Sequence, residues 1–396
     1  MKNIVIPKYV RKALVTLQSR GHLAYLVGGC VRDMLLQRQP NDWDICTSAL
    51  PEEVMEVFPS SRPTGLQHGT VTIRINSRSL EVTTFRSEGS YTDHRRPDAV
   101  SFVGDLNTDL SRRDFTMNAI ALPADGLMVD PFHGVEDIRA GLVRCVGEPE
   151  RRFEEDALRM FRALRFAARL GFDIEEKTMA AIGTKASLAA FLASERVRDE
   201  IEKMLMTPSP QIVHTAVTLG LMDAFLLHNK VDEDSFAAIS QLHKKTLERW
   251  CALSMILLDA GAISSAEGFL TALRLDNRTI RCCEHAREIL RGVEPASALE
   301  WKRLLNRCGV DAVQCAAACG DALYGGQRRK AVKAVLKSGD CFSVKHLAIG
   351  GDELLELGFR GRALGEMLNF LLDYVMEYPE NNRRELLLSL AAHWED

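Results

Sequence analysis

A change of residue pattern near residue 147 divides this chain of 396 residues into two parts that must fold differently. Before it, short runs rich in Val, Ile and Thr alternate with turn residues, a pattern typical of strands in a mixed sheet. After it, proline becomes scarce and apolar residues recur at helical spacing. Because a chain of this length exceeds one ordinary domain, we expect an α+β protein in which a small mixed α/β head precedes an all-helical region.

The head is expected to contain a sheet of about five strands and a few short helices. Runs of β-branched residues bounded by turn residues predict strands at 24–27, 43–46, 71–75, 80–85 and 100–103. Helical spacing predicts helices at 8–19, 31–36 and 51–58, and beyond the head at 153–170, 177–190 and 195–206. No internal repeat or low-complexity linker interrupts the helical part, so we expect it to be packed.

Composition and charge narrow the classes of protein to consider. The formal net charge is −4, so any basic surface for nucleic acid must be local. No window approaches 18 uncharged apolar residues, and the first residues lack the apolar run of a signal peptide, so no membrane association is expected. The ten cysteines are scattered without paired CxxC units, which argues against a disulfide framework or a zinc site and favours a reducing compartment, the cytoplasm.

Two of these cysteines, Cys315 and Cys319, lie four residues apart in an alanine-rich stretch and are expected on one helix face. Two thiols are too few for a tetrahedral metal site. We therefore interpret both as small, buried apolar side chains.

The strongest local signal is a pair of aspartates, Asp42 and Asp44, that follows the Gly28-Gly29 dipeptide. Residues two apart on a strand point to the same face, so both carboxylates are expected to project together. A divalent cation removes the repulsion between such carboxylates, and hard oxygen ligands suit Mg²⁺. The glycines can bring backbone N–H groups close to phosphate oxygens. The alternative is that Asp42 only caps a turn.

A second signal is Arg112-Arg113-Asp114 with Asn118 four residues on. The arginines suit contact with a triphosphate, and the polar side chains suit contact with a ribose. The same segment also fits a solvated helix start with Asp114 near the N-cap. Taken alone, it leaves both interpretations open.

The third signal is an arginine-bearing helix predicted from Glu154 to Leu170. Its apolar residues form a stripe on one side, whereas four polar residues lie away from that stripe or at its edge: Asp156, Arg159, Arg162 and Arg165. Asp156 and Arg159 are three residues apart and are therefore expected to be neighbours on the helix. An arginine-rich helix face is usually only solvated. A binding role for these residues therefore needs a specific chemical reason.

The pairing edges of nucleotide bases supply that reason. Cytosine and adenine each present an amino donor beside an unprotonated ring nitrogen. The carboxylate of Asp156 can accept from the amino group while the guanidinium of Arg159 donates to the ring nitrogen. Uracil and guanine present a carbonyl and an N–H there, so both contacts would become repulsive. Such a site can reject the wrong base by roughly 10⁴-fold, because its polar groups would stay unpaired.

These residues lie in segments that resemble the class II CCA-adding enzymes and bacterial poly(A) polymerases, a family within the DNA polymerase β nucleotidyltransferase superfamily. The resemblance is dense from about residue 21 to 172 and is carried by Tyr25-Leu-Val-Gly-Gly-Cys-Val-Arg-Asp-Met-Leu-Leu with Asp42-Trp-Asp44, by Arg112-Arg-Asp-Phe-Thr-Met-Asn-Ala119, by Asp130-Pro-Phe-His-Gly134 and by Glu155-Asp-Ala-Leu-Arg159. Gln37 departs from the pattern, because a glycine commonly follows the two leucines.

The resemblance implies a role for each site residue. Asp42 and Asp44 would hold the catalytic Mg²⁺ ions, and Glu81 is a candidate for the superfamily's third catalytic carboxylate or else an exposed strand residue. The nucleotide-binding residues would be Gly29, Arg32, Arg113, Asp156, Arg159, Arg162 and Arg165. The implied domains are a nucleotidyltransferase head at 1–147, a helical neck at 148–206, a helical body at 207–310 and a helical tail at 311–396 that binds tRNA.

The implied activity is template-independent addition of CCA to the 3′ end of tRNA from CTP and ATP, by two-metal phosphoryl transfer that releases pyrophosphate. The helical region would hold the tRNA acceptor arm, and Arg328-Arg329-Lys330 with Lys333 are candidate contacts. An A-adding enzyme or a poly(A) polymerase using only ATP shares these motifs and remains the alternative. The number of subunits is left open, a homodimer included.

Two segments bear on these alternatives. Residues 88–102 resemble the full-length loop of relatives that accept ATP, which disfavours an enzyme that adds only C. Residues 346–388, with Ala348-Ile-Gly-Gly-Asp352 and Asn381-Asn382, resemble the tail of Gram-positive-type CCA enzymes, which disfavours a poly(A) polymerase. An inactive RNA-binding protein would not need the two aspartates, and a transferase acting on a small molecule would leave the helical region without a substrate.

Overall fold

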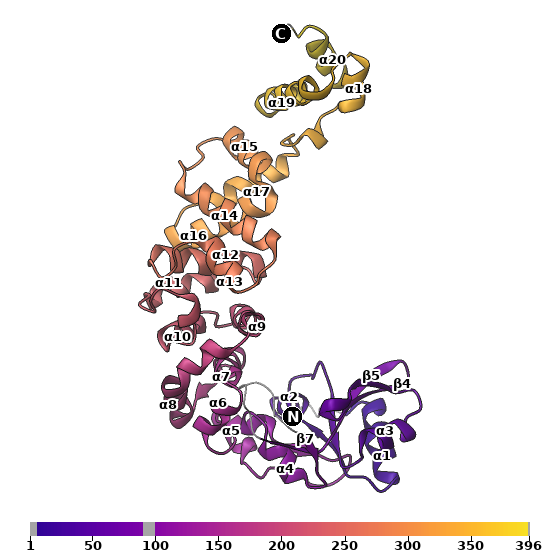
Figure 1. Cartoon of the computed structure of the whole chain (residues 1–396). Helices are drawn as coiled ribbons and strands as arrows, with labels where there is room; N and C mark the ends of the chain where they lie inside the picture. Colours follow the sequence, from indigo (N-terminus) through magenta and orange to yellow (C-terminus); the bar gives the residue numbers. More distant parts are fainter. Residues whose placement is uncertain (1–5, 90–99, 395–396) are drawn as a thin grey trace. The chain divides into compact units, whose positions relative to one another are not determined.

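The computed structural model describes residues 6–89 and 100–394, and contacts divide the chain into two compact units (Figure 1). The first unit comprises Met1–Asn229 and the second Lys230–Asp396. Within residues 6–89 and 100–394, every strand lies in the first unit, and the regular elements of the second unit are helices. The protein is thus α+β, as the sequence predicts, with a mixed head followed by helices.

The head contains a six-stranded sheet in the order β3-β4-β5-β2-β1-β8. Its strands are β1 (Ala24–Val27), β2 (Asp44–Thr47), β3 (Arg62–Gly65), β4 (Thr70–Ile75), β5 (Arg78–Thr84) and β8 (Ala121–Leu122). Strands β2 and β5 run parallel, and the other neighbouring strands are antiparallel. In the parallel pair, Asp44 lies opposite Glu81.

The sheet has six strands where the sequence predicts about five, and the difference lies at its edges. Strand β3 is largely exposed and lacks apolar alternation, and β8 has only two residues, so neither carries a periodic signal. The predicted strand at 100–103 is β7 (Val100–Phe102), which pairs with β6 (Arg86–Glu88) in a separate two-stranded sheet. A third small sheet joins β9 (Leu142–Val143) to β10 (Asp173–Ile174).

Helices cover this sheet and continue the first unit. They are α1 (Lys8–Ser19), α2 (Gly29–Leu35), α3 (Pro51–Val57), α4 (Leu106–Ser111), α5 (Gly134–Ala140), α6 (Pro149–Glu155), α7 (Leu158–Leu170), α8 (Glu176–Lys185), α9 (Ser194–Leu205) and α10 (Ile212–Thr218). Helix α1 shows why they form: Val10, Ala13, Leu14 and Leu17 lie at helical spacing on its buried side, and the helix packs on β1 and α3.

The single helix predicted from 153 to 170 is in fact two helices. Helix α6 ends at Glu155, Asp156 is extended with φ −144° and ψ 101°, and α7 starts at Leu158. The Asp156 carboxylate accepts the backbone N–H of Leu158 at 3.1 Å, a local hydrogen bond that competes with helix continuation. Similarly, the helix predicted at 177–190 is α8 followed by a 3₁₀ helix at Ala186–Phe191.

The second unit contains α11 (Glu233–Ala237), α12 (Thr246–Asp259), α13 (Ala266–Ala272), α14 (Asn277–Arg291), α15 (Ala298–Cys308), α16 (Val310–Tyr324), α17 (Arg328–Ser338), α18 (Gly351–Glu356), α19 (Gly361–Glu377) and α20 (Arg384–Ala392). Helices α12, α14 and α16 pack against one another, and α15 and α17 pack beside α16. A separate cluster of buried side chains joins α18, α19 and α20. The domain limits at 147, 206 and 310 stay a prediction.

Over residues 6–89 and 100–394, no helix combines the length and the apolar character needed to span a membrane.

Asn382 connects two parts of the C-terminal segment. Its amide donates to the His346 carbonyl at 2.9 Å, and its Oδ1 accepts from Ala348 N at 2.8 Å.

Candidate active site

A pocket of about 660 Å³ in the first unit is lined by residues from all three segments that the sequence analysis singles out. It is lined by Gly28, Gly29, Arg32, Asp42, Asp44, Arg112, Arg113, Asp114, Asn118, Asp156, Leu158, Arg159, Arg162, Arg165, Phe166, Arg169 and Arg196. Eight of these residues are arginines and four are aspartates, so the lining carries an excess of positive charge. A polyanion such as a nucleoside triphosphate therefore suits this pocket.

The glycine pair forms a sharp turn between β1 and α2. Gly28 has φ 73° and ψ −137°, a backbone conformation that side chains disfavour, and α2 begins at Gly29. A Cβ on Gly28 would lie 3.5 Å from Arg113 Nη1 and 3.7 Å from Asp44 Oδ2. The turn thus brings bare backbone close to both the arginines and the carboxylates of the pocket.

The two aspartates line the pocket together, although not for the reason that the sequence suggests. Strand β2 begins at Asp44, and Asp42 lies in the bend before it. Asp42 is exposed and Asp44 half-buried. Glu81 lies beside Asp44 in the sheet, but it is exposed and does not belong to the residues that line the pocket in the described part of the chain.

The carboxylates form a site that fits a hard divalent cation. Burial raises the pKa of Asp44, and the charges of Glu81 and Asp42 raise it further, while Arg113 partly offsets these effects. A cation placed among these oxygens would remove the repulsion, and carboxylate oxygens are the ligands that Mg²⁺ prefers. The donor set at Asp42 and Asp44 is therefore suited to Mg²⁺.

Two arginines of the pocket are held by buried partners. Arg32 is 3% exposed, donates to Asn118 Oδ1 at 2.8 Å and pairs with Asp33 at 2.7 Å. Arg113 donates to Asp109 Oδ2 at 3.0 Å, and the other oxygen of this fully buried carboxylate accepts from Arg112 at 2.7 Å. The sequence analysis missed Asp109, although its spacing of three and four residues from the two arginines is a usable signal.

Asp114 connects the second motif to α7. Its Oδ2 accepts from Nε and Nη2 of Arg162, and its Oδ1 accepts from Asn118 Nδ2 at 3.0 Å and from Phe115 N at 2.8 Å. Burial alone would raise the pKa of Asp114, but Arg162 and these hydrogen bonds outweigh it and lower the pKa to about 2. Asp114 is therefore a buried structural anion rather than a helix cap.

The two residues expected to read the base have separate partners. Asp156 forms a two-pronged ion pair with Arg196, whose Nη1 and Nη2 lie 3.2 Å and 3.0 Å from its oxygens. Arg159 donates to Glu155 Oε2 at 2.7 Å and to the Arg112 carbonyl at 3.1 Å. Because Asp156 lies before α7, the two are not helix neighbours as the sequence predicts, yet both line the pocket.

The far end of α7 carries an aromatic ring surrounded by guanidinium groups. Phe166 lies 4.2 Å, 5.1 Å and 5.5 Å from the guanidinium carbons of Arg165, Arg32 and Arg162. Arg165 also pairs with the buried Glu200 of α9. Stacking and pairing hold these long side chains in place at little entropic cost when a ligand binds.

The structure thus brings together all of the predicted site residues except Glu81: Gly29, Arg32, Asp42, Asp44, Arg113, Asp156, Arg159, Arg162 and Arg165 line one pocket. Sequence reasoning missed Phe166, Arg169 and Arg196, which line the same pocket. Arg196 gives no local signal, because its partner lies 40 residues away. Most of the predicted loop at 88–102 lies outside the described residues, which omit 90–99.

Comparisons with known proteins agree on one family. Residues 24–144 match the family model of the poly A polymerase head domain, and residues 171–229 match the probable RNA and SrmB-binding site of polymerase A. A CCA-adding enzyme from a Geobacillus species is 42% identical over 388 residues, which cover 96% of this chain and 95% of that protein. One from Limosilactobacillus fermentum is 36% identical over 390 residues, covering 96% of each.

A solved structure shares both the sequence similarity and the fold. The Bacillus stearothermophilus CCA-adding enzyme in complex with CTP matches with a TM-score of 0.80 at 31% identity, over 98% of this chain and 97% of that chain. Similarity in sequence and in fold therefore extends over nearly the full length of both proteins, and it includes the segments that line the arginine-rich pocket. On this evidence the chain belongs to the family of CCA-adding enzymes.

Proposed function

We propose that this chain adds CCA to the 3′ end of tRNA from CTP and ATP, releases pyrophosphate, and does so in the arginine-rich pocket. One observation carries the proposal: Asp42 and Asp44 share a pocket with a carboxylate and a guanidinium, Asp156 and Arg159, that can tell cytosine and adenine from the other bases. The relatives named as CCA-adding enzymes, one of them solved with CTP, support it.

Transfer in this family depends on metal ions, and we propose Mg²⁺ at Asp42 and Asp44. When bound there, such ions lower the pKa of the attacking hydroxyl and stabilise the charge of the departing pyrophosphate. Glu81 remains a candidate third carboxylate, since its charge already acts on Asp44 across the paired strands. Its exposed position outside the pocket lining supports a second role, which is to tune Asp44 from the neighbouring strand.

The phosphates and the base would contact different parts of the pocket. We assign Gly29, Arg32 and Arg113 to the triphosphate, because a bare turn and two anchored guanidinium groups lie beside the carboxylates. Asp156 and Arg159 would contact the base. A carboxylate offers about four lone-pair sites, so Asp156 can keep Arg196 and still accept from an amino group.

Arg162 and Arg165 would complete the pocket from α7. Each already has a carboxylate partner, Asp114 for Arg162 and Glu200 for Arg165. We therefore expect both to fix the shape and charge of the wall rather than to move toward the ligand. The domain limits at 147, 206 and 310 are retained as part of this proposal.

The RNA partner would bind partly through the second unit. Arg328 and Arg329 are turned toward protein partners, Glu294 and the Ala318 carbonyl, whereas Lys330 and Lys333 are exposed. These two lysines are therefore better candidates for phosphate contacts than the two arginines, which predicts salt-sensitive binding. None of the ten cysteines, all within the described residues, is joined in a disulfide, which supports the expected cytoplasmic location.

The test is incorporation of labelled CTP and ATP, with Mg²⁺, into three tRNA transcripts that lack CCA, end in C or end in CC. We expect the first to gain two C and one A and then to stop. Addition of A to the CC-ended transcript alone would instead identify an A-adding enzyme. A long A tract would identify a poly(A) polymerase, the second reading that the same motifs allow.

Asp42→Ala tests the metal ligands directly. We expect this variant to lose transfer by several orders of magnitude while tRNA binding stays close to that of the parent, because the carboxylate lies in the pocket of the first unit. Single-turnover transfer and a filter-binding titration measure the two properties. Asp125→Ala, an exposed aspartate, is the matched control. Retained transfer in Asp42→Ala would overturn the assignment.

A further inference from the structure

The interior of the second unit contains five cysteines in one place. They come from three helices that pack against one another: Cys251 from α12, Cys282 and Cys283 from α14, and Cys315 and Cys319 from α16. Each is at most 6% exposed. Cys315 and Cys319 are buried on one helix, as the sequence predicts, and three further thiols join them.

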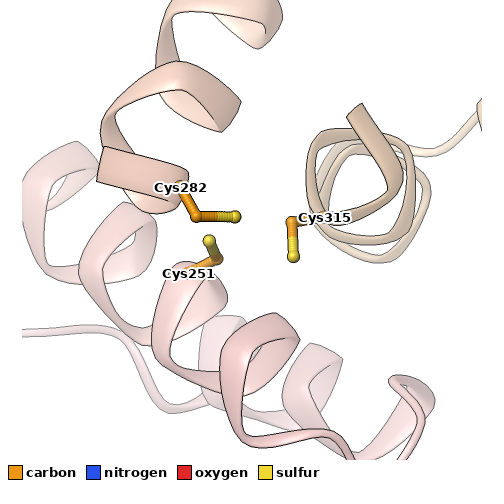
Figure 2. A group of neighbouring side chains, drawn as sticks. All are labelled: Cys251, Cys282 and Cys315. Atoms are coloured by element: carbon orange, nitrogen blue, oxygen red, sulfur yellow. The ribbon is translucent and has the colours of Figure 1, made fainter. Parts of the chain in front are cut away.

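Three of these thiols converge on a common point. Figure 2 shows Cys251, Cys282 and Cys315 side by side on three separate helices, and their sulfurs all lie within 4.8 Å of one another. A fourth sulfur, that of Cys283, lies 3.1 Å from Cys251 Sγ. Zinc with Zn–S bonds of about 2.3 Å needs sulfurs about 3.8 Å apart, so shifts of about 1 Å would bring the sulfurs of Cys251, Cys282 and Cys315 to that spacing.

Packing alone does not account for this arrangement. A small apolar residue at a helix contact needs no sulfur, and alanine serves at neighbouring buried positions of α16 such as Ala316 and Ala317. Here thiols from all three helices face the same point.

We propose that Cys251, Cys282 and Cys315 bind one thiophilic cation, Zn²⁺, through their three thiolates. Thiolates are the ligands that select zinc over Mg²⁺, so this site is distinct in chemistry from the carboxylates of the head. Each bound thiol loses one proton to solvent, and no electron is transferred. The ion would hold α12, α14 and α16 in their packing and thereby stabilise the second unit.

The first experiment measures metal in the full-length protein expressed with added zinc and purified under reducing conditions. Elemental analysis should find about one zinc ion per chain, and this zinc should persist in Asp42→Ala, which lacks a head carboxylate. Expression with Co²⁺ should give the thiolate-to-cobalt charge-transfer absorption that oxygen ligands do not produce. Zinc-free wild-type protein without this absorption would overturn the proposal, as would a disulfide between these cysteines.

Variants then locate the ion. Cys282→Ala and Cys315→Ala should each lose the zinc, and their melting temperature should fall by roughly 5 °C or more. Cys341→Ala, which removes a buried thiol of the same unit outside the cluster, should keep it. If a variant does not fold, the metal content and cobalt spectrum of the wild type still decide the question. Zinc retained in both cluster variants would show that the thiols only pack.

Discussion

At the scale of single residues, Arg196 forms an ion pair with Asp156, which lies 40 residues away in the sequence. It holds both oxygens of Asp156, which lies in the break between α6 and α7 and whose Oδ1 also accepts the backbone N–H of Leu158. The carboxylate of Asp156 can present a fixed lone pair to a base only if something fixes its orientation. In the proposed function, Arg196 would therefore position Asp156 for base selection.

Arg196→Ala should therefore weaken selection more than binding. We expect kcat/KM for CTP and ATP to fall about tenfold or more, because a charged hydrogen-bonded pair is lost, and discrimination against UTP and GTP to shrink. Steady-state transfer to a CC-ended tRNA with each nucleotide gives these ratios. Arg198→Ala, two residues away with a partner on the surface, is the control. Unchanged selectivity in Arg196→Ala would show that Asp156 needs no such support.

Gln37 is a non-glycine residue in a left-handed backbone conformation. It follows α2 with φ 56°, the left-handed region in which glycine has no steric penalty and a side chain is disfavoured. Gln37→Gly should raise the free energy of unfolding by about 0.5–1 kcal/mol without changing transfer. Urea denaturation measures this. Gln18→Gly, inside α1, should have the opposite sign.

At the scale of elements, the segment after α4 is attached to α7 by Asp114 and Arg162. Asp114 is 9% exposed, and its depressed pKa of about 2 records how much the folded state favours its ionised form. An ordinary aspartate titrates near pH 3.9. The ion pair therefore stabilises the fold fully above about pH 4, and this contribution is lost as the pH falls toward 2.

Asp114→Asn should cost about 2 kcal/mol of unfolding free energy at neutral pH, because the carboxylate charge that Arg162 pairs with is gone. The difference from wild type should shrink between pH 4 and pH 2, where wild-type Asp114 also becomes neutral. Urea denaturation at a series of pH values measures the difference. Asp125→Asn, whose side chain is 84% exposed, should differ little from wild type at any pH. A gap independent of pH would contradict the ion-pair explanation.

The elements also show how far sequence reasoning reaches. Periodic segments are well predicted: α1 has the predicted bounds, and β1 likewise. The sequence pattern does not reveal the break at Asp156, because the contacts of this carboxylate with Leu158 and the distant Arg196 leave the helical periodicity unchanged. Short edge strands such as β8 were missed as well, because two residues carry no periodicity.

In the candidate site too, residues that are close together in the sequence can be predicted, whereas contacts between distant residues cannot. Residues close together in the chain, such as Asp42 with Asp44, were predicted because their spacing alone indicates shared chemistry. Arg196 and the buried Glu200 were not, because the partners that give them meaning lie 40 and 35 residues away. The thiol cluster lies beyond sequence reasoning for the same reason, since positions 251, 282 and 315 meet only through helix packing.

At the scale of the whole molecule, the pocket and the thiol cluster belong to different units. Every residue that lines the pocket falls within Met1–Asn229, whereas all five cysteines of the cluster fall within Lys230–Asp396. Nucleotide binding should therefore depend on the first unit, and extension of tRNA should need both.

A fragment of residues 1–229 tests this division. We expect it to bind CTP in the presence of Mg²⁺ with an affinity similar to that of the full chain, and to transfer poorly to tRNA, because the second unit is gone. Isothermal titration calorimetry and the transcript assay give the two values, and circular dichroism checks that the fragment is folded. A folded fragment that does not bind CTP would show that the second unit contributes to the pocket.

The eight cations that line this pocket are all arginines, and this choice affects more than charge. A guanidinium stays protonated at any physiological pH and is not a substrate for the acetylation that neutralises lysine. Acyl donors such as reactive thioesters should therefore spare the pocket. Dicarbonyl compounds, which condense with guanidinium groups, should instead react with the accessible arginines of the pocket and weaken nucleotide binding there.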